Sequence, residues 1–299
     1  MRPIQILGAV LVPMIWGIQY AFIKAGLAVF PPLFFVGLRF AAVAAILLPF
    51  VGMPSRRERF LFALVSVFMG GLNFGLVFIG LQDTPAGVTG VANQLWSPFT
   101  LILAWPLLGE RISVRTAVGV TVALCGVALA VADPSAPVPL VPTLLIVGSA
   151  LALATGTVLV KRFGPFDPVE LMAWISLFTV PQVLTVSAIH ETGQFASISA
   201  ADITAWLAFA YTVLIGGIAG FILWFWLVAR CSMARVAPFA LLQAPFSILA
   251  GVVTRHEPLT ASLAVGAAVC LAGVVITQRG PRRNTRPSSP LKARSELSS

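Results

Sequence analysis

Apolar residues follow one another in runs of about 20 along most of the chain, and short polar segments separate the runs. A helix of this length crosses a hydrocarbon layer about 30 Å thick. The separating segments, such as "GMPSRRER", "QDTPAG" and "DPSAPVPLVP", contain the residues that end helices and form turns. The pattern predicts an all-α membrane protein with ten transmembrane helices, over 4–26, 32–52, 60–81, 86–108, 114–132, 142–161, 169–189, 203–228, 235–254 and 260–278.

The composition excludes a soluble globular protein. Of the 299 residues, 59% are hydrophobic and only 10% are charged, and the mean hydropathy is +0.98. A soluble domain carries about 25% charged residues. A core of this size has no room for so much apolar surface, so the surface must face lipid.

The basic residues predict the orientation in the membrane. With the N-terminus in the cytoplasm, sixteen of the 19 lysines and arginines fall in cytoplasmic segments, two (Lys24 and Arg255) fall outside, and Arg39 lies within a span. This asymmetry is the positive-inside pattern, and it predicts that both termini lie in the cytoplasm. It also explains the net charge of +9 without a nucleic-acid partner. Residues 279–299 hold six of these charges and are predicted to be a disordered cytoplasmic tail.

The chain is duplicated. At an offset of 147, "LWSPFTLILAWPLLGERIS" aligns with "LQAPFSILAGVVTRHEPLT", and at an offset of 137 Lys24 aligns with Lys161. The aligned halves are 4–132 (repeat 1) and 142–278 (repeat 2), with five predicted helices each. Because five is odd, the second repeat must enter the membrane in the opposite sense. Inverted repeats are typical of secondary transporters, which bind their solute near the midplane between the halves.

Three stretches resemble a known family: "WGIQYAFIKAGLAVFPPLFFVGLRF", "LLGERISVRTAVGVTVALCGVAL" and "RVAPFALLQAPFSILAGVVTRHEPLTASLAVGAAVCLAGVVI". They are similar to the two EamA repeats of the drug/metabolite transporter superfamily, and the first and last most resemble exporters of O-acetylserine and cysteine. The resemblance implies an exporter of small metabolites with ten helices, which we expect in the inner membrane, and no cofactor is expected. A multidrug or other metabolite exporter of the same superfamily is the alternative, and a membrane protein that does not transport is disfavoured by the inverted duplication.

Two prolines at equivalent places, Pro98 and Pro245, are predicted to kink helices 86–108 and 235–254 midway. Each removes a backbone donor and frees a carbonyl, which membranes tolerate where the backbone is buried in protein or lines a cavity. Polar and aromatic residues at helical spacing surround both prolines, and we interpret them as the lining of a cavity. The alternative interpretation is that they form hydrogen bonds between helices. The predicted cavity residues are Trp16, Gln19, Arg39, Asn73, Asn93, Trp96, Ser97, Thr100, Trp224, Gln243 and Ser247.

Arg39 has two interpretations that the sequence leaves open. It is either an anchor, bonded to helix-end carbonyls or to an outer acid such as Glu257, or a cationic partner for a carboxylate of the solute. Glu110 and Glu257 are predicted to be structural, at helix ends beside arginines, and Ser113 and Thr260 are placed to cap the helices that follow.

All ten acidic residues fall in loops, at helix ends or in the tail. Proton- or cation-coupled carriers commonly use a titratable group within the membrane, so the hypothesis is a facilitated uniport or coupling without a buried carboxylate. The two histidines and three cysteines show no spacing of a metal site, and no clustered nucleophile and base indicates an enzyme. The expected partners are a small-molecule solute and the lipid bilayer, and a homo-oligomer is left open.

Overall fold

The computed structural model describes residues 2–108, 113–132, 137–231, 236 and 239–278. Throughout these ranges the regular structure is helical, with no strand. The elements of repeat 1 are α1 (Pro3–Leu27), α2 (Pro32–Leu47), η1 (Leu48–Phe50), α3 (Arg56–Ser66), η2 (Val67–Leu72), α4 (Asn73–Asp83), α5 (Ala86–Asn93), α6 (Trp96–Leu108) and α7 (Val114–Val131). Those of repeat 2 are α8 (Leu140–Phe163), α9 (Pro168–His190), α10 (Gln194–Ala200), α11 (Ile203–Ala210), η3 (Tyr211–Ala219), α12 (Gly220–Arg230), α14 (Gln243–Arg255) and α15 (Ala261–Gln278).

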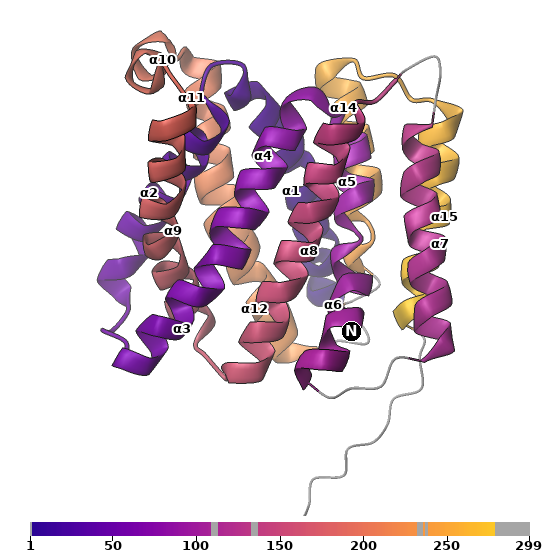
Figure 1. The fold of residues 1–299 in the computed structure, drawn as a ribbon, viewed down its shortest axis with the longest axis horizontal. Coiled ribbons are helices and arrows are strands. Elements are labelled where there is room, and N and C mark those ends of the chain that lie inside the picture. The colour runs from indigo at the N-terminus through magenta and orange to yellow at the C-terminus, as the bar shows by residue number, and fades with distance from the viewer. Residues whose placement is uncertain (1, 109–112, 133–136, 232–235, 237–238, 279–299) are drawn as a thin grey trace, which may run out of the picture.

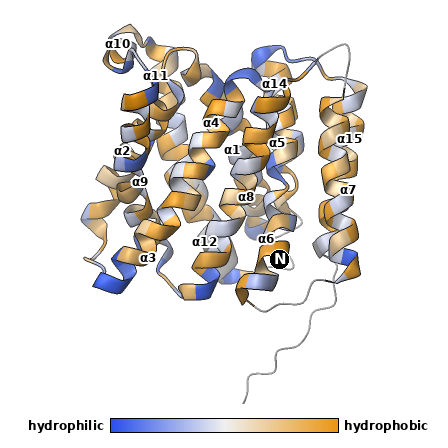
Figure 2. Cartoon of the chain, in the orientation of Figure 1, coloured by the Kyte–Doolittle hydropathy of each residue, from blue (hydrophilic) through white to orange (hydrophobic). Residues whose placement is uncertain are grey.

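The chain is a multi-pass membrane protein. Seven helical stretches of the described chain are long and apolar enough to cross a bilayer. A further helix, Ala261–Thr277, is also apolar but shorter. Figure 2 shows the most hydrophilic segments at the two ends of the helices, with predominantly apolar residues between them. The count of ten spans stays a prediction, since the regions 86–108 and 235–254 are not single helices.

The pattern predicts one kinked helix over 86–108, and the structure corrects this. A turn at Gln94 and Leu95 separates α5 from α6. Within the connection 190–202, which the pattern marks as a loop, the short helix α10 forms.

The last helices of the two repeats, α7 and α15, lie side by side at one edge of the molecule (Figure 1). They run antiparallel, because Gly119 contacts Thr277 whereas Gly126 contacts Cys270. A methyl group on Gly126 would overlap the backbone of Cys270, and one on Gly273 would overlap that of Ala123. Small residues at these places therefore allow the two backbones to approach closely.

The remaining helix contacts repeat the same symmetry. The packing of α1 on α14 has its counterpart in the packing of α8 on α6. In the contacts of α2 with α9 and of α7 with α15, a helix of repeat 1 packs against the equivalent helix of repeat 2. Two copies related by a two-fold axis would produce this pattern, as expected for inverted repeats.

Both repeats contain a π-helical segment at equivalent positions. In repeat 1 it is η2, which contains Gly70 and Gly71, and in repeat 2 it is η3, which contains Gly216 and Gly217. A π-helix is rare and alters which carbonyls are bonded within the helix, and such segments occur frequently at functional sites.

Candidate functional site

Two helix breaks lie at equivalent places in the repeats, and we refer to them as the paired breaks. The first is the turn at Gln94 and Leu95, before α6, and the second is the turn at Leu241 and Leu242, before α14. Hydrogen bonds of the first break have counterparts at the second. Leu95 N donates to the Ala92 carbonyl at 3.1 Å, and Leu242 N donates to the Phe239 carbonyl at 2.9 Å.

The prolines lie just after the breaks and not in the middle of a helix, which corrects the predicted kinks. Pro98 is the third residue of α6, and Pro245 is the third residue of α14. Proline is tolerated in a first turn because its missing N–H would have no helical partner there. The carbonyls of Gln94 and Leu241 accept instead from Ser97 N at 3.3 Å and Ala244 N at 3.4 Å.

The two breaks meet across the boundary between the repeats. The side chain of Gln94 is buried, and its Nε2 donates to the Ala240 carbonyl at 3.2 Å. One turn away, Gly90 of α5 packs against Ser247 of α14 so closely that a methyl group on Gly90 would overlap the hydroxyl. The backbone beside the second break is therefore hydrogen-bonded by a side chain of the first break.

The break also separates residues that were expected to share one helix face. Asn93 is the last residue of α5 and Trp96 is the first of α6, so helical spacing does not relate them. Within α6, Ser97 and Thr100 are half-buried, and Thr100 Oγ1 donates to the Trp96 carbonyl at 2.7 Å. Asn93 is buried.

On α14, Gln243 and Ser247 have different surroundings. Gln243 Nε2 donates to the hydroxyl of Tyr20 on α1 at 3.2 Å, which joins the second break to the first helix. Ser247 is fully buried, and its hydroxyl donates to the Ala244 carbonyl at 2.8 Å.

A second group of predicted residues gathers at η3. Trp16 Nε1 donates to the Gly216 carbonyl at 3.1 Å, and Gln19 packs directly against Gly216. The ring of Trp224 lies 5.8 Å from that of Trp16, centroid to centroid. These residues bring α1 of repeat 1 against the π-helical segment of repeat 2.

Arg39 also contacts η3. Its Nε donates to the Thr212 carbonyl at 3.1 Å, and its guanidinium carbon lies 4.2 Å from the centroid of the Phe74 ring and 5.1 Å from that of Phe40. The side chain is 2% exposed, and its Nη1 has no hydrogen-bond partner among the described residues.

Asn73 is the residue that follows η2. It is buried, and its Nδ2 donates to the Met69 carbonyl at 3.4 Å. Its Oδ1 is buried and finds no donor in the described part of the chain.

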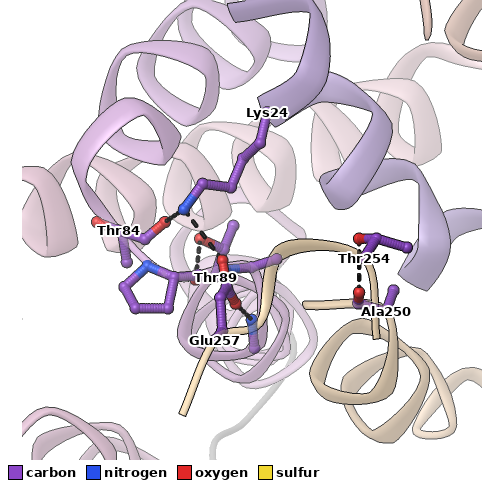
Figure 3. Close-up of polar contacts among 9 residues, drawn as sticks. Lys24, Thr84, Thr89, Ala250, Thr254 and Glu257 are labelled. Atoms are coloured by element: carbon purple, nitrogen blue, oxygen red, sulfur yellow. Dashed lines mark hydrogen bonds and ion pairs between the residues drawn. The ribbon is translucent and has the colours of Figure 1, made fainter. Parts of the chain in front are cut away.

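Glu257 binds Lys24, and the anchor partnership with Arg39 that the sequence allowed is wrong. Figure 3 shows Lys24 reaching both Glu257 and the Thr84 carbonyl, at 3.1 Å and 3.0 Å from Nζ. The Lys24 side chain is 15% exposed and that of Glu257 12% exposed. The carboxylate also accepts from Ala86 N, at 2.8 Å from Oε2, and so caps α5. This cluster connects α1, the start of α5 and the segment after α14.

The remaining predicted helix-end residues lie as follows. Ser113 Oγ accepts from Thr116 N at 3.1 Å at the start of α7. Thr260 Oγ1 accepts from Leu263 N at 3.1 Å at the start of α15. Glu110 lies outside the described residues.

Glu191 is a second acid that caps a distant helix, and sequence reasoning missed it. Its carboxylate accepts from Leu33 N at 2.8 Å and Phe34 N at 3.0 Å, at the start of α2. A signal was present, since Pro31 and Pro32 begin that helix without a Ser, Thr, Asp or Asn cap. The identity of the partner depends on tertiary packing.

Two surface hollows among the described residues have linings that include none of the predicted cavity residues. One, of about 220 Å³, is bordered by Lys24, Leu27, Ala28, Leu81, Gln82 and Arg255. The other, of about 10 Å³, is apolar and is bordered mainly by α9, η3 and α12. The described residues include no group of three or more His, Cys, Asp or Glu that could hold a metal ion.

Comparison with known proteins gives concordant results. The model of the EamA-like transporter family matches residues 3–132 and 141–279. A "probable amino-acid metabolite efflux pump" of Escherichia coli (strain K12) is 27% identical, over 92% of this chain and 94% of its own. A protein of the same name from Salmonella typhimurium (strain LT2) is 28% identical, over 94% and 97%.

A third relative, the uncharacterized transporter YvbV of Bacillus subtilis (strain 168), is 31% identical over 88% of both chains. One solved crystal structure superposes with a TM-score of 0.58 at 18% identity, over 89% of this chain and 98% of the other. At that identity the superposition establishes a shared fold.

Proposed function

The chain belongs to the EamA-like transporter family, and from this we propose that it exports small amino-acid-like metabolites across the inner membrane. The observation that carries the cargo class is the name of two relatives that match over nearly their whole length, the probable amino-acid metabolite efflux pumps. Solutes of the O-acetylserine and cysteine type are the specific cargo proposed.

The proposed route for the solute runs between the repeats, past the paired breaks and η3. Discontinuous membrane helices in inverted repeats commonly surround a binding site near the midplane. The contact between Gln94 and the Ala240 carbonyl, and that between Gln243 and Tyr20, supports this location because both cross from one repeat to the other. Separation of the repeats would expose these amides to a polar solute.

The proposed orientation places both termini in the cytoplasm, as the distribution of basic residues predicts. In this orientation the ion pair of Lys24 and Glu257 lies at the outer end. The pair holds α1 of repeat 1 to the segment after α14 of repeat 2. Opening of the outer side would therefore require this contact to break.

Transport is proposed to be a facilitated uniport. The sequence places every acidic residue in a loop, at a helix end or in the tail. Of these, Glu191 and Glu257 accept backbone N–H groups at helix starts, which is a structural use of the carboxylate. A proton-coupled carrier commonly uses a titratable group within the membrane instead.

Counterflow in proteoliposomes tests the cargo and the coupling together. Vesicles are loaded with unlabelled amino acids, and uptake of labelled O-acetylserine or cysteine is measured with and without an imposed pH gradient. Trans-stimulated uptake without a gradient is the expected result. Uptake of cationic or aromatic drugs only would replace the cargo with that of a multidrug exporter, and accumulation that requires the gradient would contradict the uniport.

A further inference from the structure

Arg39 is a buried positive charge that has no counter-ion among the described residues. A guanidinium has five N–H donors and is charged at all physiological pH values. Within the described part of the chain it makes one hydrogen bond, from Nε to the Thr212 carbonyl at 3.1 Å. Nη1 is buried and has no partner among the described residues, and the side chain as a whole is 2% exposed.

The surrounding rings do not satisfy these donors. Phe74 and Phe40 present rings at 4.2 Å and 5.1 Å from the guanidinium carbon, which stabilises a cation electrostatically. The N–H groups, however, lie in the plane of the guanidinium and need acceptors at its edge. Among the described residues, Lys24 and Glu257 form a salt bridge and Arg39 forms none. No carboxylate of the described residues therefore accepts from the guanidinium.

The edge of the guanidinium faces the π-helical segment where side chains are smallest. Nη2 lies against Gly217, at 3.7 Å from the position that a Cβ atom would take there. Gly216 precedes it, and its carbonyl accepts from Trp16 Nε1. The contact between α2 and η3 therefore brings a cation beside backbone that carries no side chain, at a boundary between the repeats.

We infer that Arg39 binds the carboxylate of the transported solute, with Nη1 donating to it and Nε kept on the Thr212 carbonyl. Planar, charge-assisted hydrogen bonding is the strongest interaction available to a guanidinium, and a carboxylate matches its geometry. The inference rests on the proposed function and narrows it to solutes with a free carboxylate. Esters and decarboxylated amines are excluded from efficient transport.

The equivalent position in repeat 2 provides a matched control. At the offset of 137, Arg39 corresponds to Ser176 on α9. Ser176 is 1% exposed, and its hydroxyl donates to the Met172 carbonyl at 2.6 Å. The position is equally buried but has no charge and no unpaired donor among the described residues.

The test is counterflow of labelled O-acetyl-L-serine by the full-length chain, with the unlabelled acid and its methyl ester as competitors. In the wild type, we expect the ester to compete at least about 10-fold more weakly, because it cannot pair with the cation. Arg39→Gln should raise the KM for the acid about 10- to 100-fold and abolish the difference between acid and ester. Ser176→Ala should leave both values unchanged.

Retention of the wild-type KM and of acid-over-ester selectivity by Arg39→Gln would overturn the inference. Size-exclusion chromatography establishes whether that variant is folded, and Arg39→Lys replaces it if it is not. Arg39→Lys should weaken competition by the acid and not by the ester, and unchanged competition by both would again overturn the inference.

The two proposals fail in different ways. If the wild type transports the acid and the ester equally, the carboxylate site is wrong and the amino-acid cargo stands. If the wild type does not transport amino acids but binds other carboxylates through Arg39, the proposed cargo is wrong and the carboxylate site stands. A wild type that transports neither amino acids nor any other carboxylate overturns both.

Discussion

The two π-helical segments η2 and η3 occupy equivalent places in the repeats, yet the side chains packed against them differ in charge and in hydrogen bonding. Against η2, α9 places neutral residues whose donors have partners. Thr179 Oγ1 donates to the Ile175 carbonyl at 2.8 Å, and Gln182 Nε2 donates to Ser66 Oγ at 2.7 Å.

Against η3, α1 and α2 place an indole and a cation. Trp16 donates to the Gly216 carbonyl, and Arg39 donates to the Thr212 carbonyl while its Nη1 has no partner among the described residues. The duplication thus reproduced the backbone in both repeats, whereas the charge is present at one of them. Such an unpaired buried charge costs stability, which a functional role in binding would explain.

The largest expected effect comes from removing this charge with Arg39→Met. We expect counterflow of carboxylate solutes to fall at least about 10-fold, because a charge-assisted hydrogen bond is lost. The melting temperature of the purified chain should stay the same or rise, because a buried unpaired charge is removed.

The control variant is Gln182→Met, which removes an amide that is already bonded. It should lower the free energy of unfolding by about 1 kcal/mol and leave transport unchanged. Thermal unfolding in detergent measures both variants. A larger loss of stability for Arg39→Met than for Gln182→Met would identify Arg39 as a structural anchor.

A smaller effect is expected from filling the glycines of the two π-helical segments. A methyl group at Gly70 overlaps Thr179, which is β-branched and has a restricted χ1, whereas one at Gly216 overlaps the far end of the flexible Gln19 side chain. Gly70→Ala should therefore lower the free energy of unfolding by about 1–3 kcal/mol, and Gly216→Ala should lower it by less. Gly52→Ala, at a position with nothing within 4 Å, is the control. Equal losses at the two sites would show that the neighbours are equally rigid.

The ion pair of Lys24 and Glu257, at the predicted outer end, should contribute about 1 kcal/mol to the free energy of unfolding, because both side chains are partly exposed. A double-mutant cycle with Lys24→Met and Glu257→Gln measures this coupling energy by thermal unfolding. Glu257→Gln should be the more destabilising single variant, because the carboxylate also caps α5 at Ala86. A coupling energy of zero would mean that the pair does not hold the repeats together.

An effect of similar size is expected at a feature that both repeats share. Ser113 and Thr260 occupy equivalent positions and each accept a backbone hydrogen bond of 3.1 Å at a helix start. Ser113→Ala and Thr260→Ala should each cost about 1 kcal/mol of unfolding free energy. Clearly unequal losses would show that the asymmetry of the repeats extends beyond η3.

Much of the fold follows from patterns that operate locally. Apolar runs, turn residues and the offset of 147 are sufficient to predict helices, two repeats and the alignment of Pro98 with Pro245. The helix breaks were missed because a proline after a break and a proline within a kink leave the same sequence signal. The turn between Asn93 and Trp96 also means that their spacing of three residues does not place them on one helix face.

The site was less predictable, because its partners come from distant parts of the chain. Arg39 was recognised as unusual, but the Thr212 carbonyl that it binds belongs to a π-helical segment with no clear sequence signature. The partners of Glu191 and Glu257 are helix starts more than 150 residues away. Only tertiary packing determines such pairs.

The most direct test of the central claim, that Arg39 binds the solute beside η3, is thiol accessibility at Gly217. Gly217→Cys is prepared after Cys125, Cys231 and Cys270 have been replaced by Ser or Ala, and Gly71→Cys in η2 is the equivalent control. Reaction with a membrane-impermeant thiol reagent is followed in the presence and absence of O-acetyl-L-serine. We predict that the solute slows labelling several-fold in the Gly217→Cys variant and has no effect in the Gly71→Cys variant. Labelling at position 217 that is absent, or that the solute does not change, would contradict the account.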